Sequence, residues 1–230
     1  MRLKDSIRTA TRGLRHAKVR SMLTMLGIII GIASVILLMS IGSSAQALIL
    51  NHVKGIGSNL IFVLPGGSGG SRTVAPASSQ GIVIKTLVQS DVDALKREAS
   101  IQAVVPEVRG LSRAVSDLND ASGSYEGVTA DFFSVRNLGI AKGYAFSKSD
   151  VESHNRVAVI GFTLAKTLFA DRNPVGKTFR LKDVTFRVTG VLEKEGIGPG
   201  GIDQDNVIII PITVAQEQLL GINYFAFITV

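Results

Sequence analysis

The chain has 230 residues, and its 25 Lys and Arg against 18 Asp and Glu give a formal net charge of +7. It contains no Cys, which excludes a disulfide scaffold, a thiolate zinc site, a Cys nucleophile and a cysteine-ligated iron–sulfur cluster. Hydrophobic residues make up 46% of the chain, so disorder along its whole length is excluded as well.

The positive charge is concentrated at the N-terminus. Residues 1–21 contain one acidic residue and seven basic ones, Arg2, Lys4, Arg8, Arg12, Arg15, Lys18 and Arg20. A nucleic-acid-binding body would carry its basic residues on a folded face among aromatic side chains, so no nucleic-acid partner is predicted. Apolar residues recur at helical spacing in this segment, which predicts an amphipathic helix on the cytoplasmic membrane surface. A disordered basic segment is the alternative.

Residues 22–41 read MLTMLGIIIGIASVILLMSI, without a charge. A helix of this length is about 30 Å long, the thickness of the hydrocarbon core, so we expect a transmembrane helix over residues 22–43. The basic residues precede it and none follows in residues 42–53, which places the N-terminus in the cytoplasm and the rest outside. A signal peptide cleaved near Ala45-Gln46-Ala47 is the alternative, but the apolar run is longer than signal peptides carry.

Two glycines inside the apolar segment, Gly27 and Gly31, are one helical turn apart. This spacing removes side-chain bulk from one face, and it predicts packing against a second transmembrane helix. Glycine is also common in membrane helices, so a chance pair is the alternative.

The residues after the apolar segment alternate between strand and helix patterns. We expect a helical stalk over 44–58, a strand over 59–64 and a loop over 66–80. A helix opens at Ser90, the expected N-cap, with Asp91 in its first turn. The next strand covers 101–106 and stops at Pro106.

A second block continues the mixture of strands and helices. Phe179, Leu181, Val184, Phe186 and Val188 alternate with polar residues around Lys182-Asp183, which predicts a hairpin over 178–193 with one buried face. Thr213 and Gln216 form an expected capping box, and Gly221 an expected helix C-cap. Further strands are expected at 125–130, 156–161, 207–212 and 224–230, a helical turn at 131–137 and a helix at 162–170. The fold class predicted is α+β.

No segment carries a complete catalytic, cofactor or metal pattern. Residues 171–178, DRNPVGKT, end like a phosphate-binding loop, but Asp171 replaces the first Gly and a strand pattern follows. Residues 203–206 lack the Gly and distant Glu of a calcium loop, so we expect an exposed turn. His16, His52 and His154 are scattered along the chain, and Glu193 and Glu195 are expected to be exposed. We therefore predict no catalytic, cofactor or metal residues, and no enzyme.

The order of these segments resembles one family. An N-terminal LKDSIRTATRGLRHAKVRSMLTMLGIIIGIASVI is followed by GIGSNLIFVLPG, GVTADFFSVRNLGIAKG, RVAVIGFTLAKTLF, NPVGKTFRL, FRVTGVLEKEG and NVIIIPITVAQEQLLG. Together these blocks resemble the MacB-type ABC transporter permeases, members of the FtsX-like permease family. The resemblance identifies Asn173, Pro174, Gly176 and Lys177 as a structural motif, a turn that enters the hairpin.

The resemblance also implies a domain organisation. It assigns residues 1–21 to a cytoplasmic basic segment and 22–43 to the membrane helix, before a two-lobed extracytoplasmic α+β domain. Residues 44–111 would begin a porter-like lobe built from βαβ units, and 112–221 would form an inserted lobe. Residues 222–230 would start a second porter-like unit, so the chain is expected to be truncated at its C-terminus.

The function that the resemblance implies is mechanical coupling in the bacterial inner membrane, with the main domain in the periplasm. A separate ABC ATPase subunit would hydrolyse ATP, and the permease, expected as a homodimer, would relay the motion for export or efflux. A membrane-fusion adaptor and an outer-membrane channel are further expected partners. A single-pass anchored binding or adaptor module is the alternative, and an anchored enzyme is a weaker one because no polar cluster is apparent.

Overall fold

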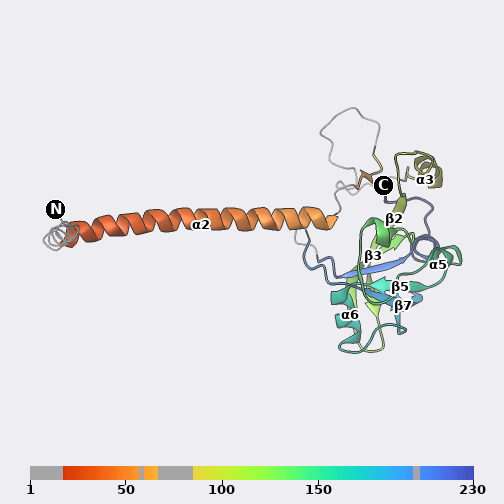
Figure 1. Cartoon of the computed structure of the whole chain (residues 1–230). Coiled ribbons are helices and arrows are strands. Elements are labelled where there is room, and N and C mark those ends of the chain that lie inside the picture. The colour runs from red at the N-terminus through yellow and green to blue at the C-terminus, as the bar shows by residue number, and fades with distance from the viewer. Residues whose placement is uncertain (1–17, 57–59, 67–84, 199–202) are drawn as a thin grey trace. The chain divides into compact units, whose positions relative to one another are not determined.

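The computed structural model describes residues 18–56, 60–66, 85–198 and 203–230. The chain separates into two compact units, Met1–Gly55 and Ile56–Val230, and we call the second one the body. Helix α2 (Lys18–Ile56) has 39 residues without a break, and Figure 1 shows it as one straight helix. The predicted helical stalk is therefore confirmed as far as Ile56.

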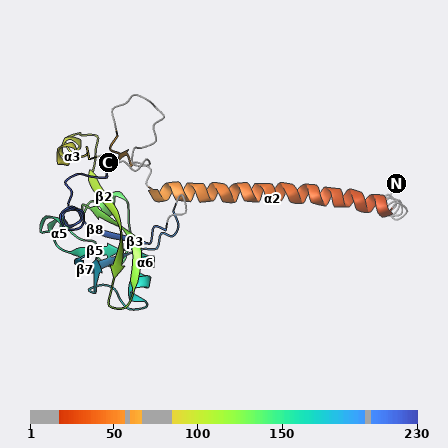
Figure 2. The same cartoon turned by 180° about the vertical axis from the view of Figure 1, so that it is seen from behind.

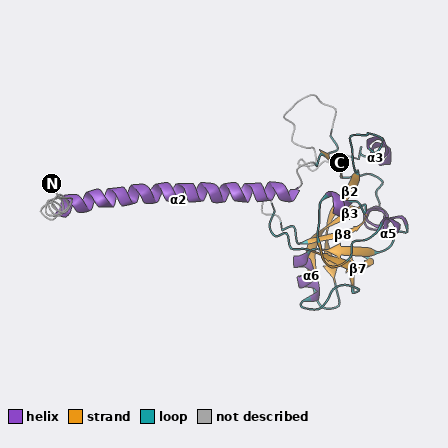
Figure 3. Ribbon diagram, viewed as in Figure 1, coloured by secondary structure: helices purple, strands orange, loops and turns teal. Residues whose placement is uncertain are grey.

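The body consists of short helices and mostly short strands. In chain order they are β1 (Phe62–Val63), α3 (Gln89–Leu95), β2 (Val105–Val115), β3 (Asp120–Val128), α4 (Phe132–Val135), β4 (Ile140–Gly143), α5 (Lys148–Glu152), β5 (Val157–Ile160), α6 (Phe162–Phe169), β6 (Thr178–Leu181), β7 (Val184–Leu192), β8 (Val207–Pro211), α7 (Ile212–Val214), η3 (Ala215–Leu220, a π-helix) and β9 (Phe227–Thr229). Figure 3 shows the strands in orange with the short helices around them. The predicted α+β class is confirmed.

The nine strands of the described residues form one mixed sheet in the order β1-β9-β2-β3-β8-β5-β7-β4, and β6 pairs with both β2 and β7. Through β6, the pairings of β2, β3, β8, β5, β7 and β6 close into a ring. The β3–β8 and β5–β7 pairs are parallel and the others antiparallel. Figure 2 shows β2 and β3 from behind as long, curved neighbours. The ring gives the body a small barrel whose interior must be filled by side chains.

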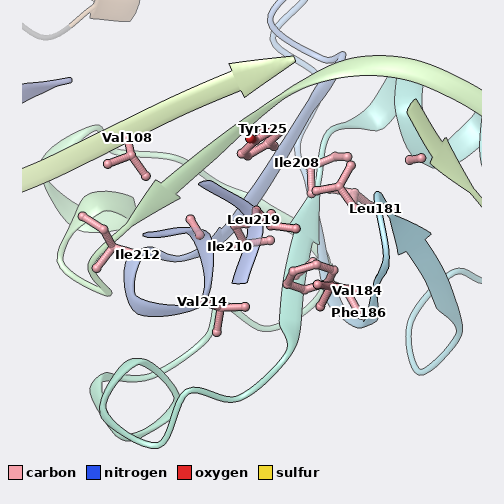
Figure 4. Close-up of a cluster of buried hydrophobic side chains, with 14 of the residues drawn as sticks. Val108, Tyr125, Leu181, Val184, Phe186, Ile208, Ile210, Ile212, Val214 and Leu219 are labelled. Carbon is pink, nitrogen blue, oxygen red and sulfur yellow. The ribbon is translucent and has the colours of Figure 1, made fainter. Parts of the chain in front are cut away.

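Strands β5 and β8 lie in the middle of the sheet and are covered on both faces. Ala158, Ile160, Ile208 and Ile210 belong to the larger hydrophobic cluster, and their neighbours Val157, Val159 and Ile209 to a smaller one. Burial on both faces explains why these strands read as uninterrupted apolar runs. Figure 4 shows part of the larger cluster, with Tyr125, Phe186 and Ile208 among the buried side chains.

The predicted hairpin is confirmed as β6 and β7. Phe179 pairs with Phe186 across the strands, and their stacked rings lie 5.9 Å apart. The turn at Lys182-Asp183 places Lys182 at φ 52°, a left-handed conformation that a side chain disfavours. The Nζ of Lys182 donates a hydrogen bond to the carbonyl of Leu219 at 2.7 Å, which ties this turn to η3.

Several predicted boundaries are wrong. The strand expected over 125–130 is Asp120–Val128, for example, and the one expected over 224–230 is Phe227–Thr229. Helix α3 begins at Gln89, so Val88 and not Ser90 is the N-cap, and the Asp91 carboxylate accepts a hydrogen bond from the Val88 N–H at 2.9 Å. The strand expected to stop at Pro106 runs on to Val115. Pro106 is tolerated because it pairs only with Ile228 of β9, while the ladder with β3 starts one residue later.

The predicted capping box is also wrong. The hydroxyl of Thr213 donates to the carbonyl of Val151 at 2.7 Å, and the amide of Gln216 donates to the carbonyl of Tyr224 at 3.1 Å. Both side chains therefore bond to other segments of the body, and α7 begins directly after Pro211. Gly221 is confirmed as the C-cap, in the left-handed conformation at φ 63°.

The predicted division of the body into two lobes stays a prediction. Strand β2 runs through the expected boundary between residues 111 and 112 and pairs with β3 on both sides of it.

One carboxylate lies inside the sheet. Glu107 of β2 is fully buried, and burial raises the pKa of its carboxyl above the ordinary value of 4.5, although Arg136 and the Thr229 hydroxyl act in the opposite direction. Because the folded-state pKa lies above the unfolded one, the native protein keeps this proton over a pH range in which the unfolded chain has lost it. The stability from this group is complete below the unfolded value and is lost as the pH rises through the folded value.

A comparison of the wild type with Glu107→Gln tests whether the stability contributed by the Glu107 carboxyl is lost as the pH rises. Equilibrium unfolding of the full chain in detergent micelles should show the free energy of unfolding of the wild type falling relative to the variant as the pH rises above about 4.5. The slope should not exceed about 1.4 kcal/mol per pH unit, the limit for one proton. Parallel profiles of unfolding free energy against pH for the two proteins would show that burial does not raise the pKa of the Glu107 carboxyl.

Candidate functional site: an apolar helix and a charge cluster

Residues Met22–Ser44 of α2 make 23 consecutive residues that are long and apolar enough to cross a membrane, by length and composition. Polar side chains within this stretch bond to the helix itself. The hydroxyl of Ser34 donates to the carbonyl of Ile30 at 2.8 Å, and that of Ser43 to the carbonyl of Ser40 at 3.0 Å. These hydroxyls can therefore enter an apolar medium with a hydrogen-bond partner already in place.

Gly27 and Gly31 lie on α2 with open space beside them. A methyl group built at either glycine meets no atom within 4 Å in the described structure. The helix thus presents a flat strip to which another helix can come close. Packing there stays a prediction.

Most of the predicted basic residues lie outside the described residues. This applies to Arg2, Lys4, Arg8, Arg12 and Arg15, and with them to the predicted amphipathic helix. Lys18 is the first residue of α2, and Arg20 lies in its first turns with an exposed side chain. Their role in orientation stays a prediction.

The segment that ends like a phosphate loop is a turn. The Asn173 side-chain oxygen accepts a hydrogen bond from the Val175 N–H at 3.3 Å, and the Lys177 N–H donates to the carbonyl of Pro174 at 3.0 Å. Gly176 lies at φ 84°, where glycine is favoured. Strand β6 follows directly, so there is no helix N-terminus to receive a phosphate.

A charge cluster surrounds the buried Glu107. Its carboxylate accepts a hydrogen bond from the Thr229 hydroxyl at 2.5 Å and faces the Arg136 Nη2 at 3.3 Å. Arg109 Nη2 lies 3.6 Å from the same carboxylate and 2.9 Å from Glu126. The cluster therefore joins β2, β3 and β9 to the residue that follows α4.

Each arginine of the charge cluster also lies over aromatic rings. The guanidinium of Arg109 is 4.5 Å from the centre of the Phe227 ring. That of Arg136 is 5.4 Å from Phe62 and 5.1 Å from Phe132. The Nε of Arg136 is buried and makes no hydrogen bond in the described structure, so the carboxylate and the rings position this side chain.

Sequence reasoning missed the charge cluster. Glu107 and Arg109 are two residues apart in a strand, so they share one face, and this spacing beside apolar neighbours was the available signal. Their partners Arg136 and Thr229 are distant in the sequence, and no local pattern connects them to Glu107.

A second buried carboxylate corrects the expected exposed turn at 203–206. Asp205 is buried, and its two oxygens accept hydrogen bonds from the N–H groups of Glu195 at 2.8 Å and Gly196 at 3.0 Å. Asp205 thus closes the base of the Gly-rich loop between β7 and β8. Glu193 and Glu195 are exposed, as predicted.

Among the residues that the structure describes, the remaining polar groups are not gathered into a recognisable reaction centre. A hollow of about 290 Å³ beside α6 is lined by Lys142, Lys166, Asp171 and Arg172 among others, and all four are exposed. His154 Nε2 lies 3.1 Å from Glu217, a surface pair. Within the described ranges, no group of three or more His, Cys, Asp or Glu is arranged to hold a metal ion.

Known proteins with similar sequences and folds were found. The chain is 31% identical to the macrolide export ATP-binding/permease protein MacB of Wolinella succinogenes over 230 residues, covering 100% of this chain and 34% of that protein. It is 34% identical to the protein of the same name from Marinobacter nauticus, covering 99% and 34%. The chain thus spans about a third of the length of these relatives.

Two solved structures resemble this chain. The periplasmic region of MacB from Actinobacillus actinomycetemcomitans matches with a TM-score of 0.64 and 25% identity, covering 77% of this chain and 76% of that one. The extracellular domain of the ABC-type transporter YknZ from Gram-positive bacteria matches with a TM-score of 0.60 and 20% identity, covering 74% and 82%, a likeness of fold. The model of the MacB-like periplasmic core domain matches residues 21–230. The chain therefore belongs to the MacB-like periplasmic core domain family.

Proposed function

We propose that the chain is part of the permease subunit of a MacB-type ABC transporter and couples cytoplasmic ATP hydrolysis to conformational change outside the membrane. The observation that carries this proposal is the unbroken helix α2, which begins at Lys18, runs through the apolar segment and ends at Ile56, a few residues before the body's first strand. The family match over residues 21–230 supports the same role.

The length of α2 suits a helix that transmits motion. Its 39 residues extend about 58 Å, whereas the hydrocarbon core is about 30 Å thick. With Met22–Ser44 in the lipid, the remainder emerges as a helical stalk. A helix satisfies its backbone hydrogen bonds internally, so a movement of the membrane portion is carried along it.

The orientation follows from charge. Seven basic residues precede the apolar segment, and the positive-inside rule retains such residues in the cytoplasm. The body is then periplasmic, in agreement with the location in the names of the similar family and structure. We assign the protein to the bacterial inner membrane.

The partners follow from what the chain supplies. We assign ATP hydrolysis to an ABC ATPase partner, because the relatives' names pair ATP binding with a permease. Gly27 and Gly31 offer a face for a second permease copy. The relatives' names describe macrolide export, and we extend to this chain only export or efflux, with a periplasmic adaptor and an outer-membrane channel as further partners.

A single-pass anchored binding or adaptor module is the second candidate. It is favoured by the presence of one helix able to span a membrane among the described residues. Such a module needs no ATPase, and this difference separates the two candidates.

An ATPase partner tests the proposed function. Affinity purification of the intact protein from membranes of its own host should recover an ATPase, and the rate of ATP hydrolysis should rise when the two are reconstituted together in proteoliposomes. An unrelated single-span membrane protein, purified in the same way, is the control. An ATPase rate that does not respond to the permease would favour the anchored module.

The orientation can be measured by cysteine labelling, because the chain has no Cys of its own. A membrane-impermeant maleimide should label Leu118→Cys, in the turn between β2 and β3, in intact spheroplasts. Ser6→Cys should be labelled only after permeabilisation. Replacing the seven basic residues of the N-terminal segment by Gln should reduce labelling of Leu118→Cys, because the charge that retains the N-terminus is gone. Unchanged labelling would show that charge does not set the orientation.

The glycine face predicts a defect in pairing. Gly27→Leu with Gly31→Leu should weaken self-association in lipid vesicles by about tenfold, since the added side chains keep two helices apart. Energy transfer between labelled copies measures the association. Ala33→Leu adds the same kind of bulk about 200° around the helix from Gly31 and should have little effect. Equal losses in both variants would argue against a specific glycine interface.

A further inference from the structure

The strand that follows α2 in the chain lies at the edge of the sheet, where Val63, with Ile228 and Val230 of the adjacent C-terminal segment, also packs in or against the larger hydrophobic cluster. Among the described strands, β1 pairs only with β9, with Phe62 opposite Thr229 and Val63 opposite Ile228. Ile61 and Val230 exchange two backbone hydrogen bonds, of 2.8 and 3.0 Å. We call β1 and β9 together the terminal ribbon. A two-stranded ribbon of this length is not stable alone.

The terminal ribbon meets the rest of the sheet at the start of β2. Within β2, strand β9 pairs with Val105–Glu107, and the Ala226 N–H donates to the carbonyl of Glu107 at 2.8 Å. Beyond Glu107, β2 belongs to the closed ring. Strand pairing between the terminal ribbon and the rest of the sheet is therefore confined to this short junction.

The charge cluster lies at the same junction and contacts both strands of the ribbon. The Glu107 carboxylate holds the hydroxyl of Thr229 in β9. Arg136 covers the ring of Phe62 in β1, and Arg109 covers that of Phe227 in β9. The two rings lie 6.2 Å apart. Three charged residues of the body thus hold three side chains of the ribbon.

A gain in stability does not explain why charged side chains are buried at this junction. A buried ion pair loses much of its attraction to desolvation, and apolar side chains would hold the strands about as well. Directional contacts instead favour a single register. A shift of β9 by one residue would move Thr229 to the opposite face, away from Glu107.

We propose that the charge cluster around Glu107 is a clasp that fixes the terminal ribbon in one register on β2, so that movement of α2 is transmitted to the body. The inference deepens the proposed function and rests on it for the coupling step. Glu107 is a positioning residue in this view: it acts through Thr229 and Arg136.

Hydrogen exchange of the full chain in lipid nanodiscs tests the clasp without any partner. Glu107→Gln should speed exchange at the amides of Ile61, Ala226 and Val230 by about tenfold or more. The Gln amide replaces one of the two acceptor oxygens, which face the Arg136 and Thr229 donors, by an NH2 group that can only donate. Asp120→Asn is the matched control. It breaks the 2.6 Å ion pair with Arg113 at the far end of β2 and β3, and it should leave these amides unchanged.

A second variant covers the case in which Glu107→Gln does not fold. Thr229→Val keeps the shape of the side chain but removes the hydroxyl that Glu107 holds, and it should speed exchange at the same amides by a smaller factor. Wild-type exchange in both variants would overturn the clasp.

A reversible crosslink separates coupling from a merely structural role. Pro106 of β2 and Ile228 of β9 lie opposite each other in antiparallel register, where a Cα separation of about 4.5–5.5 Å suits a disulfide that joins the ribbon to β2. Pro106→Cys with Ile228→Cys would give the only thiols in the chain. In the Glu107→Gln background, oxidation should restore slow exchange and the permease-dependent ATPase rate, and a reductant should remove both.

The outcomes distinguish the two proposals. If Glu107→Gln gives faster exchange and the oxidised crosslink fails to restore the ATPase rate, the role of the clasp in coupling is overturned. If the wild type itself shows no permease-dependent ATPase rate, the proposed function fails, and the exchange measurement still decides whether the clasp exists.

Discussion

Burial of the apolar side chains of α2 in lipid is the interaction on which the proposed mechanism depends. Between Met22 and Ile41 the large apolar side chains are 52–77% exposed in the protein alone. Moving one such side chain from water into an apolar medium is worth about 1.5–3 kcal/mol, and more than ten of them act together. In the proposed mechanism, a helix anchored by these side chains stays in the bilayer under load, and the body is pulled or turned through its chain connection.

The body combines a ring of six paired strands with the two-stranded terminal ribbon. Six strands close into a ring, so β3, β8 and β5 are paired on both sides. The ring interior is filled by side chains such as Tyr125 and Phe186, and a close-packed interior resists deformation. The terminal ribbon has only a few backbone pairs. Deformation under load is therefore expected at the junction with β2, where the charge cluster lies.

Local patterns predicted the parts of this fold that depend on local interactions. Alternation in β6 and β7 and the apolar runs of β5 and β8 report directly which faces are buried. The prediction for Thr213 failed because its hydroxyl bonds to Val151, a residue that no capping rule considers. The charge cluster could not be predicted for the same reason, since Arg136 and Thr229 lie 29 and 122 residues from Glu107.

The two buried carboxylates of the body act where segments leave the ring. Glu107 lies where β2 passes from the ring to the terminal ribbon, and it faces two arginines. Asp205 lies at the base of the Gly-rich loop and is held by backbone N–H groups. A methyl group at Gly161 would meet the carbonyl oxygen of Asp205 at 2.2 Å, so the loop base packs directly against the start of α6. Directional polar contacts hold the chain at both points where a segment leaves the ring. In the proposed mechanism, the strand pairs inside the ring would therefore not be the first to separate under load.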